Sequence, residues 1–338
     1  MLSILDFWRK RQPKFVYSYI PEPTYRQKDP EQMVEMATQQ IGNWEASGSN
    51  VPPVFVPDFG TVTMARPWGG LVKKTDDGQI FIDPVSGNID EILDIEPAPN
   101  GDIQLAVDLY NEVKRRTGRD DIRFVTPDYQ GVLGTASQIM AQEELMVAMY
   151  TDGEKVHKFL DLVCRRNIQF MKDLQAKVRV DGNVWPYIWL PQEIGVVVTE
   201  DFMPLLSPEM YRDFGMPYLR RMGQEFGAVF IHSCGSWIQH AEMIRDSTIP
   251  YLGVDHCYPY TKLEDIQAVL PNWVLQPGYE FFKTLEYADF PAYLDAMIQK
   301  RQGDTCLWPA INSNAVWKYD QVRKVLDKHR IDFEGFCR

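Results

Sequence analysis

The stretch AVFIHSCGSWIQHAEMIRDSTIPYLGVDHC, residues 228–257, contains the unit that decides the fold. An apolar run over 228–232 is followed by a helical pattern over 237–245 and by a second apolar run over 251–257. Short apolar runs that alternate with amphipathic helices predict parallel strands joined by helical crossovers. We therefore expect a βαβ unit here, with both strands buried in a parallel sheet.

The same alternation predicts about eight strands along the chain. They are expected at 54–59, 124–127, 184–190, 196–199, 228–232, 251–257, 273–276 and 305–309. No Gly-x-Gly-x-x-Gly motif follows the first strand, so a closed (β/α)8 barrel, the TIM-barrel fold, is favoured over an open doubly wound sheet. We expect a single α/β domain over 1–338, with N-terminal helices and a first strand over 1–50 and a hairpin excursion over 69–90.

The charge balance and the cysteine content exclude several classes of protein. The 338 residues include 35 basic and 47 acidic side chains, and the net charge of −12 argues against nucleic-acid binding. No apolar run is long enough to span a membrane, and the first residues do not have the pattern of a secretory signal. The five cysteines form no dense disulfide framework, which is typical of a protein from the reducing cytoplasm.

The strand end at 229–235 carries the strongest chemical signal. His232 and Cys234 are two residues apart in extended backbone, which places both side chains on one face. Imidazole nitrogen and thiolate sulfur are typical zinc ligands, and two from one strand end form half a site. The next strand ends in His256 and Cys257, of which strand alternation allows only one to point towards that site. The alternative is that these residues only pack or form hydrogen bonds in the core.

Three carboxylates also follow predicted strands, and we name them as candidate catalytic residues. Asp58 lies just before Gly60 and is either a site residue or an Asp that stabilises a turn. Glu200 and Asp201 come shortly before a helix that starts at Ser207. Adjacent carboxylates can bind a metal, raise one another's pKa, or cap a loop.

Aromatic residues alternate along the strand predicted over 184–190. Trp185, Tyr187 and Trp189 are candidates for binding a flat cofactor or ligand, and core packing is the alternative. Outside the two strand ends, Cys164 and Cys306 are expected to pack in the interior, and His240 is expected to face solvent.

The order of several short motifs resembles the uroporphyrinogen decarboxylase superfamily. The matching runs are ELM at 144–146, YTD at 150–152, VHKFL at 156–160, ED at 200–201, SPEMY at 207–211, PY at 217–218, FIHSCG at 230–235 and GVD at 253–255. The resemblance covers nearly the whole chain from about residue 50, and it implies a (β/α)8 barrel.

Within that superfamily, the His-x-Cys-Gly strand end is similar to the zinc-dependent cobamide methyltransferases. This resemblance implies a zinc ion held by His232, Cys234 and a later cysteine, which binds a thiol and activates it as the thiolate that attacks a methyl-corrinoid. The position of the later cysteine is Ile311 in this chain. The third ligand is therefore expected from a short set: Cys257 first, with His256 and Cys306 as the alternatives.

The resemblance also implies partners. The chain has no Asp-x-His-x-x-Gly corrinoid loop, because Asp332 stands where the glycine would be. We therefore expect a methyltransferase that works with a corrinoid protein and a small-molecule methyl donor or acceptor, either a thiol or a methoxylated or methylated compound.

The departures from the superfamily leave two alternatives open. The first is a metal-free decarboxylase of a tetrapyrrole or other polycarboxylate that uses Asp58. Resemblance to true uroporphyrinogen decarboxylases would imply an N-terminal Arg-Gln-Ala-Gly-Arg segment and a histidine after the last strand. The sequence has neither feature at those places. The second is a non-catalytic subunit that binds a corrinoid or a small molecule.

Overall fold

The computed structural model describes residues 3–10, 15–16, 18–20, 29–46, 49, 51–75, 80–183, 188–279, 286–312 and 319–331. Its strands are β1 (Ser18–Ile20), β2 (Val54–Phe55), β3 (Val72–Lys74), β4 (Ile80–Ile82), β5 (Arg123–Thr126), β6 (Val180–Asn183), β7 (Val196–Thr199), β8 (Val229–His232), β9 (Tyr251–Tyr258), β10 (Val274–Tyr279), β11 (Cys306–Leu307) and β12 (Ala310–Asn312). Its α-helices are α1 (Ile4–Lys10), α2 (Pro30–Ala46), α3 (Ile89–Leu93), α4 (Asp102–Thr117), α5 (Val132–Ile139), α6 (Gln142–Thr151), α7 (Gly153–Gln175), α8 (Pro208–Phe214), α9 (Met216–Phe226), α10 (Ala241–Asp246), α11 (Leu263–Val269), α12 (Phe290–Lys300) and α13 (Tyr319–Lys328). None of the helices in these ranges is long and apolar enough to cross a membrane.

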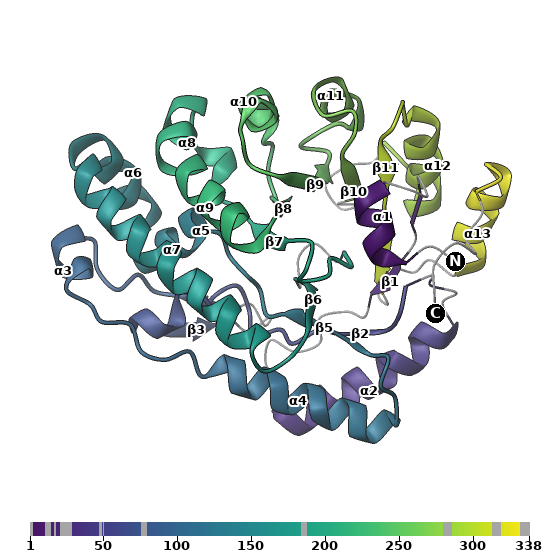
Figure 1. The fold of residues 1–338 in the computed structure, drawn as a ribbon, viewed down its shortest axis with the longest axis horizontal. Coiled ribbons are helices and arrows are strands. Elements are labelled where there is room, and N and C mark those ends of the chain that lie inside the picture. The colour runs from purple at the N-terminus through teal and green to yellow at the C-terminus, as the bar shows by residue number, and fades with distance from the viewer. Residues whose placement is uncertain are drawn as a thin grey trace.

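The central strands pair in parallel, which confirms the α/β class. The larger ladder has the order β11-β10-β9-β8-β7, the smaller one has the order β2-β5-β6, and β1 pairs in parallel with β12. Figure 1 shows the helices on the outside of a curved row formed by these strands. Within the described ranges the ladders do not join into one closed barrel, so the structure shows a single α/β domain with parallel sheets.

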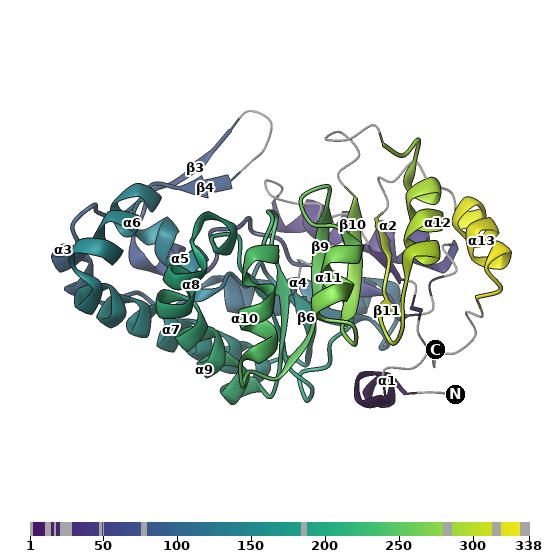
Figure 2. The same cartoon turned by 90° about the horizontal axis from the view of Figure 1, so that it is seen from above.

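The N-terminal elements and the hairpin follow the sequence prediction. Helices α1 and α2 and strand β1 occupy the first 50 residues, and β3 pairs with β4 in an antiparallel hairpin. Figure 2 shows that this hairpin projects from the opposite side of the molecule to α1.

The strand predicted over 184–190 is not found in the described part of that range, residues 188–190. Strand β6 ends at Asn183, residues 184–187 lie outside the described part of the chain, and residues 188–190 form no strand. The chain instead folds back on β6, with the Leu190 N–H donating to the Asp181 carbonyl at 3.2 Å. Trp189 and Leu190 are buried by this return, so their apolar character reports core packing and not strand pairing.

The strands separate two apolar clusters. Val196, Val198 and Ile231 belong to the cluster between the strands and the surrounding helices, whereas Val197 and Phe230 belong to a second cluster on the inner face. Successive residues of a strand point to opposite sides, so a strand that is apolar at every position is buried on both faces. Both strands that flank the quoted βαβ helix therefore lie in the interior.

Helix α1 covers one end of the inner cluster. Phe7 and Trp8 are buried, and the Trp8 ring stacks on Trp308 with ring centroids 5.8 Å apart. The Trp8 Nε1–H donates to the Trp189 carbonyl at 2.8 Å, so the polar atom of the indole is also satisfied. The N-terminal segment thus seals the inner face of the sheet at the end from which the strands start.

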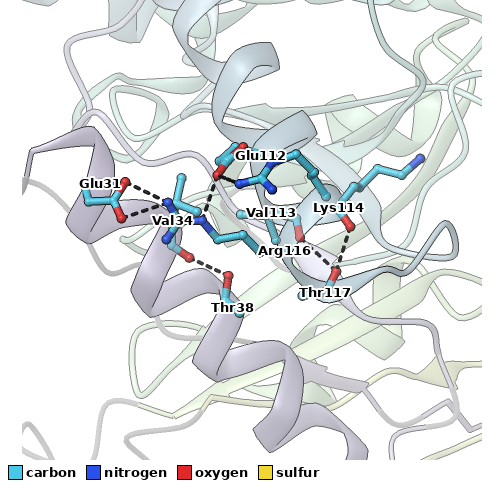
Figure 3. Close-up of polar contacts among 9 residues, drawn as sticks. Glu31, Val34, Thr38, Glu112, Val113, Lys114, Arg116 and Thr117 are labelled. Atoms are coloured by element: carbon cyan, nitrogen blue, oxygen red, sulfur yellow. Dashed lines mark hydrogen bonds and ion pairs between the residues drawn. The ribbon is translucent and has the colours of Figure 1, made fainter.

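Helices α2 and α4, which lie far apart in sequence, are held side by side at the surface. Arg116 of α4 donates from Nη2 to Glu31 of α2 at 2.8 Å and from Nε to Glu112 at 2.8 Å (Figure 3). Exposed ion pairs of this kind contribute little free energy. Only the pair with Glu31 joins the two helices, because the pair with Glu112 lies within α4.

We predict that Trp8→Ala lowers the free energy of unfolding by about 3–5 kcal/mol, because it removes a fully buried ring and leaves a cavity. The measurement is urea unfolding followed by circular dichroism. Arg9→Ala, at an exposed position of the same helix, is the control and should change stability by less than about 0.5 kcal/mol. Equal effects from both variants would show that α1 does not seal the inner cluster.

Candidate metal centre

His232 and Cys234 come together at the end of β8. His232 is the last residue of the strand, and the chain leaves the strand through Ser233. The Cys234 Sγ lies 3.3 Å from the His232 Nε2, so both side chains share a face as the sequence spacing predicts. His232 is buried, whereas Cys234 is exposed. The pair therefore joins a fixed imidazole to an accessible thiol.

Asp255 of β9 holds the other nitrogen of the imidazole. The ladder pairs Ile231 with Val254, which brings Asp255 level with His232, and the Asp255 Oδ2 lies 2.5 Å from the His232 Nδ1. Burial lowers the pKa of His232, but Asp255, Cys234 and Asp201 together outweigh that effect and hold the pKa well above its ordinary value. A carboxylate on one imidazole nitrogen directs the other nitrogen towards a metal or a proton.

Asp201 completes a cluster of three potential ligands. It follows β7, whose Thr199 pairs with His232. The Cys234 N–H donates to the Asp201 Oδ1 at 2.7 Å, and that oxygen lies 3.9 Å from the His232 Nε2. One ligand atom from each of Asp201, His232 and Cys234 lies within 4.8 Å of the others. Of the adjacent carboxylates Glu200 and Asp201, Asp201 is therefore the one that lies beside His232 and Cys234.

Glu200 points to the other side of the strand. It is 3 % exposed, and the groups whose charges it influences, Tyr211, Tyr251 and Cys164, belong to the layer between the strands and the helices. Its Oε1 lies 1.9 Å from the point where a Cβ on Gly131 would stand, so a side chain at that position would displace the Glu200 carboxyl. Burial, and secondarily the charge of Asp201, raises the pKa of Glu200 to about 8. This carboxyl is neutral at pH 7.

Asp128 belongs to the same rim and was not identified from the sequence. It follows β5 and is 1 % exposed, accepting from Gln130 at 2.8 Å and from the Thr199 hydroxyl at 3.1 Å. The pKa of Asp128 is raised to about 7, mainly by burial and to a smaller extent by the charges of Asp201 and Asp58, against the effects of Gln130 and His232. The signal that could have found it is the one that found Asp58, an aspartate directly after a buried strand.

Asp58 lies on this rim as well. It is buried, it influences the ionisation of Asp128, and its Oδ1 accepts the Gly60 N–H at 2.7 Å. The structure therefore shows both features considered from the sequence, a turn-stabilising contact and a position beside other site carboxylates.

The other candidates lie elsewhere or outside the described residues. Trp185 and Tyr187 are not described, and Trp189 packs in the inner apolar cluster with the Arg123 guanidinium 3.4 Å from its ring centroid. The backbone of Cys257 lies in β9 and pairs with Gly278 of β10, while its side chain is outside the described part.

Cys164, Cys306 and His240 lie away from the metal centre and pack in the interior. Cys164 and Cys306 are buried, as expected. His240 is buried rather than exposed, with its Nε2 3.0 Å from the Met203 carbonyl and its ring 4.9 Å from Tyr211, because the segment after β8 packs against the loop that follows β7.

The geometry admits two chemistries, and the charges favour one of them. Asp255, His232 and Cys234 lie in the order of an acid–base–nucleophile triad. However, although Cys234 is exposed as a residue, the atoms packed around its sulfur reduce solvation and raise the pKa of the thiol, and the neighbouring Asp201 and Asp255 raise it further against the effect of His232. The Cys234 N–H, a potential oxyanion donor, is already bonded to Asp201. Negative charge around the imidazole and thiol instead favours a cation between them.

Comparison with known proteins shows that the fold has been seen in a solved structure. No protein-family model and no curated protein sequence matches the chain. Chains of solved structures do match, and one of them is a methyltransferase from Methanosarcina mazei, with a TM-score of 0.65 and 14 % sequence identity over 93 % of this chain and 92 % of that one. At this identity the likeness is one of fold: a single α/β domain with parallel sheets, matched over nearly its whole length.

We predict that Glu200→Gln flattens the pH dependence of stability. The raised pKa of Glu200 means that unfolding releases a proton above the ordinary carboxyl pKa of 4.5, so stability falls as pH rises from about 5 to about 8. Removing the carboxyl should reduce this loss by on the order of 3 kcal/mol.

The measurement is urea unfolding at several pH values between 5 and 8. The exposed Glu35→Gln on α2 serves as the control and should keep the wild-type slope. A Glu200→Gln profile as steep as that of the wild type would contradict the placement of a neutral carboxyl in the outer layer.

Proposed function

We propose that the chain is a zinc-dependent methyltransferase that moves a methyl group between a small substrate and a corrinoid carried by a partner protein. The observation that carries the proposal is the His232–Cys234 pair at the carboxyl end of β8, with Asp255 behind the imidazole. Its support from outside the chain is the shared fold with a protein named as a methyltransferase. The small substrate is a thiol or a methoxylated or methylated compound.

The donor atoms fit a zinc ion. Zinc bonds of about 2.0–2.1 Å to nitrogen and about 2.3 Å to sulfur at a tetrahedral angle separate the two ligand atoms by about 3.5 Å. The observed separation of the His232 Nε2 and the Cys234 Sγ is 3.3 Å. Asp255 on the opposite imidazole nitrogen supplies the outer carboxylate that zinc-bound histidines usually have.

The residues at the carboxyl ends of the strands would have separate roles in methyl transfer to a thiol. His232 and Cys234 would hold the metal, and Asp255 keeps the imidazole oriented. Bound there, zinc supplies the Lewis acidity that favours a thiolate over a thiol at neutral pH. The sulfur would form its bond to the methyl carbon as the cobalt–carbon bond breaks, with the electron pair remaining on the corrinoid. Asp128, with a pKa of about 7, is suited to accept the proton that the thiol loses.

The charge of the rim weighs against the decarboxylase alternative. The strongest charges that act on Asp128 come from Asp201, Asp58 and His232, and those that act on Cys234 come from His232, Asp201 and Asp255. Neither set contains a lysine or an arginine. A polycarboxylate substrate needs cationic partners for its carboxylates. Asp58 is therefore better suited to shaping the acidic rim than to decarboxylating a tetrapyrrole.

We also propose that the parallel ladders belong to a closed (β/α)8 barrel and that the protein acts in the cytoplasm. Gln130 forms a parallel bridge to Thr199 between the two larger ladders, and Phe15 forms another to Leu307 at the far edge. Strand order follows chain order from β5 to β6 and from β7 to β11. A reducing compartment suits the exposed Cys234, which must remain a free thiol to bind a metal.

We predict about one equivalent of zinc in protein purified without chelator, measured by elemental analysis, and less than about 0.2 equivalents in Cys234→Ala and His232→Ala. Transfer from methylcobalamin to a thiol, followed anaerobically by the corrinoid absorbance, should fall at least about 100-fold in both variants, because each loses a protein ligand. Ser236→Ala in the same loop is the matched control and should retain both properties.

Other outcomes distinguish the alternatives. Zinc below about 0.2 equivalents in the wild type, with no effect of Cys234→Ala, would refute the metal-dependent function. Carboxyl loss from uroporphyrinogen by metal-free protein would support the decarboxylase. Cobamide binding without turnover in metal-free protein would indicate a binding subunit.

A further inference from the structure

We propose that Asp201 supplies the third protein ligand of the metal centre, beside His232 and Cys234, so that the centre contains one thiolate and not two. The inference rests on the proposed metal-dependent function and specifies its site. It replaces the expectation, based on the sequence, that a second cysteine is the third ligand.

The strand register excludes Cys306. Across the ladder Phe230 pairs with Gly253, Gly253 with Val274, and Val274 with Cys306. Cys306 is therefore level with Phe230, two residues before His232 and three strands away from it. It is fully buried in the inner apolar cluster, which lies towards the start of the strands. A side chain at that level cannot share a ligand sphere with His232.

Asp201 is already in the position that a third ligand needs. Thr199 of β7 pairs with His232 of β8. Asp201 and Cys234 therefore each lie two residues beyond that pair, in the segments that follow these two neighbouring strands. The Asp201 Oδ1 accepts the Cys234 N–H at 2.7 Å and lies 3.9 Å from the His232 Nε2. The hydrogen bond fixes the carboxylate beside the thiol and occupies one lone pair of Oδ1, so the carboxylate keeps further lone pairs for coordination.

Charge balance supports the same assignment. A neutral imidazole, one thiolate and one carboxylate together carry two negative charges, which neutralise a divalent ion. Asp255 lies behind the imidazole, where it orients His232 rather than coordinating.

The choice of ligand affects the chemistry at the open position. A carboxylate is a harder and weaker electron donor than a thiolate, so an ion bound by nitrogen, sulfur and oxygen remains a stronger Lewis acid than one bound by two sulfurs. Three protein ligands leave a fourth position for substrate, as is usual for catalytic zinc sites. Because Cys234 is exposed, a substrate would reach the metal from the solvent side of this residue.

The test is the number of sulfur atoms around zinc in the full-length, zinc-loaded protein, measured by zinc X-ray absorption. We expect one sulfur among nitrogen and oxygen neighbours in the wild type and the same count in Cys257→Ser. In competition with a chromophoric zinc chelator, Asp201→Asn should weaken zinc binding at least about 10-fold. The amide oxygen of the replacement can still accept the Cys234 N–H, so this variant tests charge and coordination while keeping the loop contact.

Two controls make the result decisive. Asp213→Asn, an exposed aspartate on α8, should leave zinc affinity unchanged. A melting curve for each variant separates loss of metal from loss of fold. Two sulfurs in the wild type, falling to one in Cys257→Ser, would overturn the assignment of Asp201 and leave the methyltransferase proposal standing. Failure of the wild type to bind zinc would refute the proposed metal-dependent function itself, and the ligand assignment with it.

Discussion

Each central strand is buried on both faces, and this constraint governs where polar groups can lie. Val197 and Phe230 face the inner apolar cluster, while Val196, Val198 and Ile231 face the helices. A polar side chain on such a strand is costly unless it has partners. Polar residues therefore appear at the carboxyl ends of the strands, where the inward positions change from Val197 to Thr199 and from Phe230 to His232. The apolar core thereby determines the place of the candidate site.

At that rim, His232 lies among several carboxylates from different strands. Asp255 contacts the imidazole directly, Asp201 contacts the backbone of Cys234, and Asp58 raises the pKa of Asp128. Carboxylates so close together are stabilised by a cation, because each otherwise raises the pKa of its neighbours. The same charges disfavour an oxyanion or a polycarboxylate at this rim, which is why we propose metal-assisted methyl transfer rather than acyl transfer or decarboxylation.

Much of the fold followed from periodicity, and its main error has a clear cause. The apolar runs around Val196 and Val229 correctly predicted strands, because two-sided burial leaves a continuous apolar pattern. The run near Trp189 is also apolar, but Trp189 and Leu190 reach the inner cluster because the chain folds back on β6. Composition reports burial, and it does not distinguish a paired strand from a buried return. For the site, the close approach of His232 and Cys234 followed from their spacing alone.

Local sequence patterns are enough to predict the alternation of strands and helices, the hairpin formed by β3 and β4, and a histidine–cysteine pair on one strand end, because these depend on local periodicity and on residues two apart. Tertiary structure alone decided which carboxylates join that pair. Register between β7, β8 and β9 brings Asp201 and Asp255 to His232 and turns Glu200 towards the helices, although Glu200 and Asp201 are adjacent in sequence. The physical reason is that strand register is set by packing over the whole sheet, so contacts between strands are not encoded in any single segment.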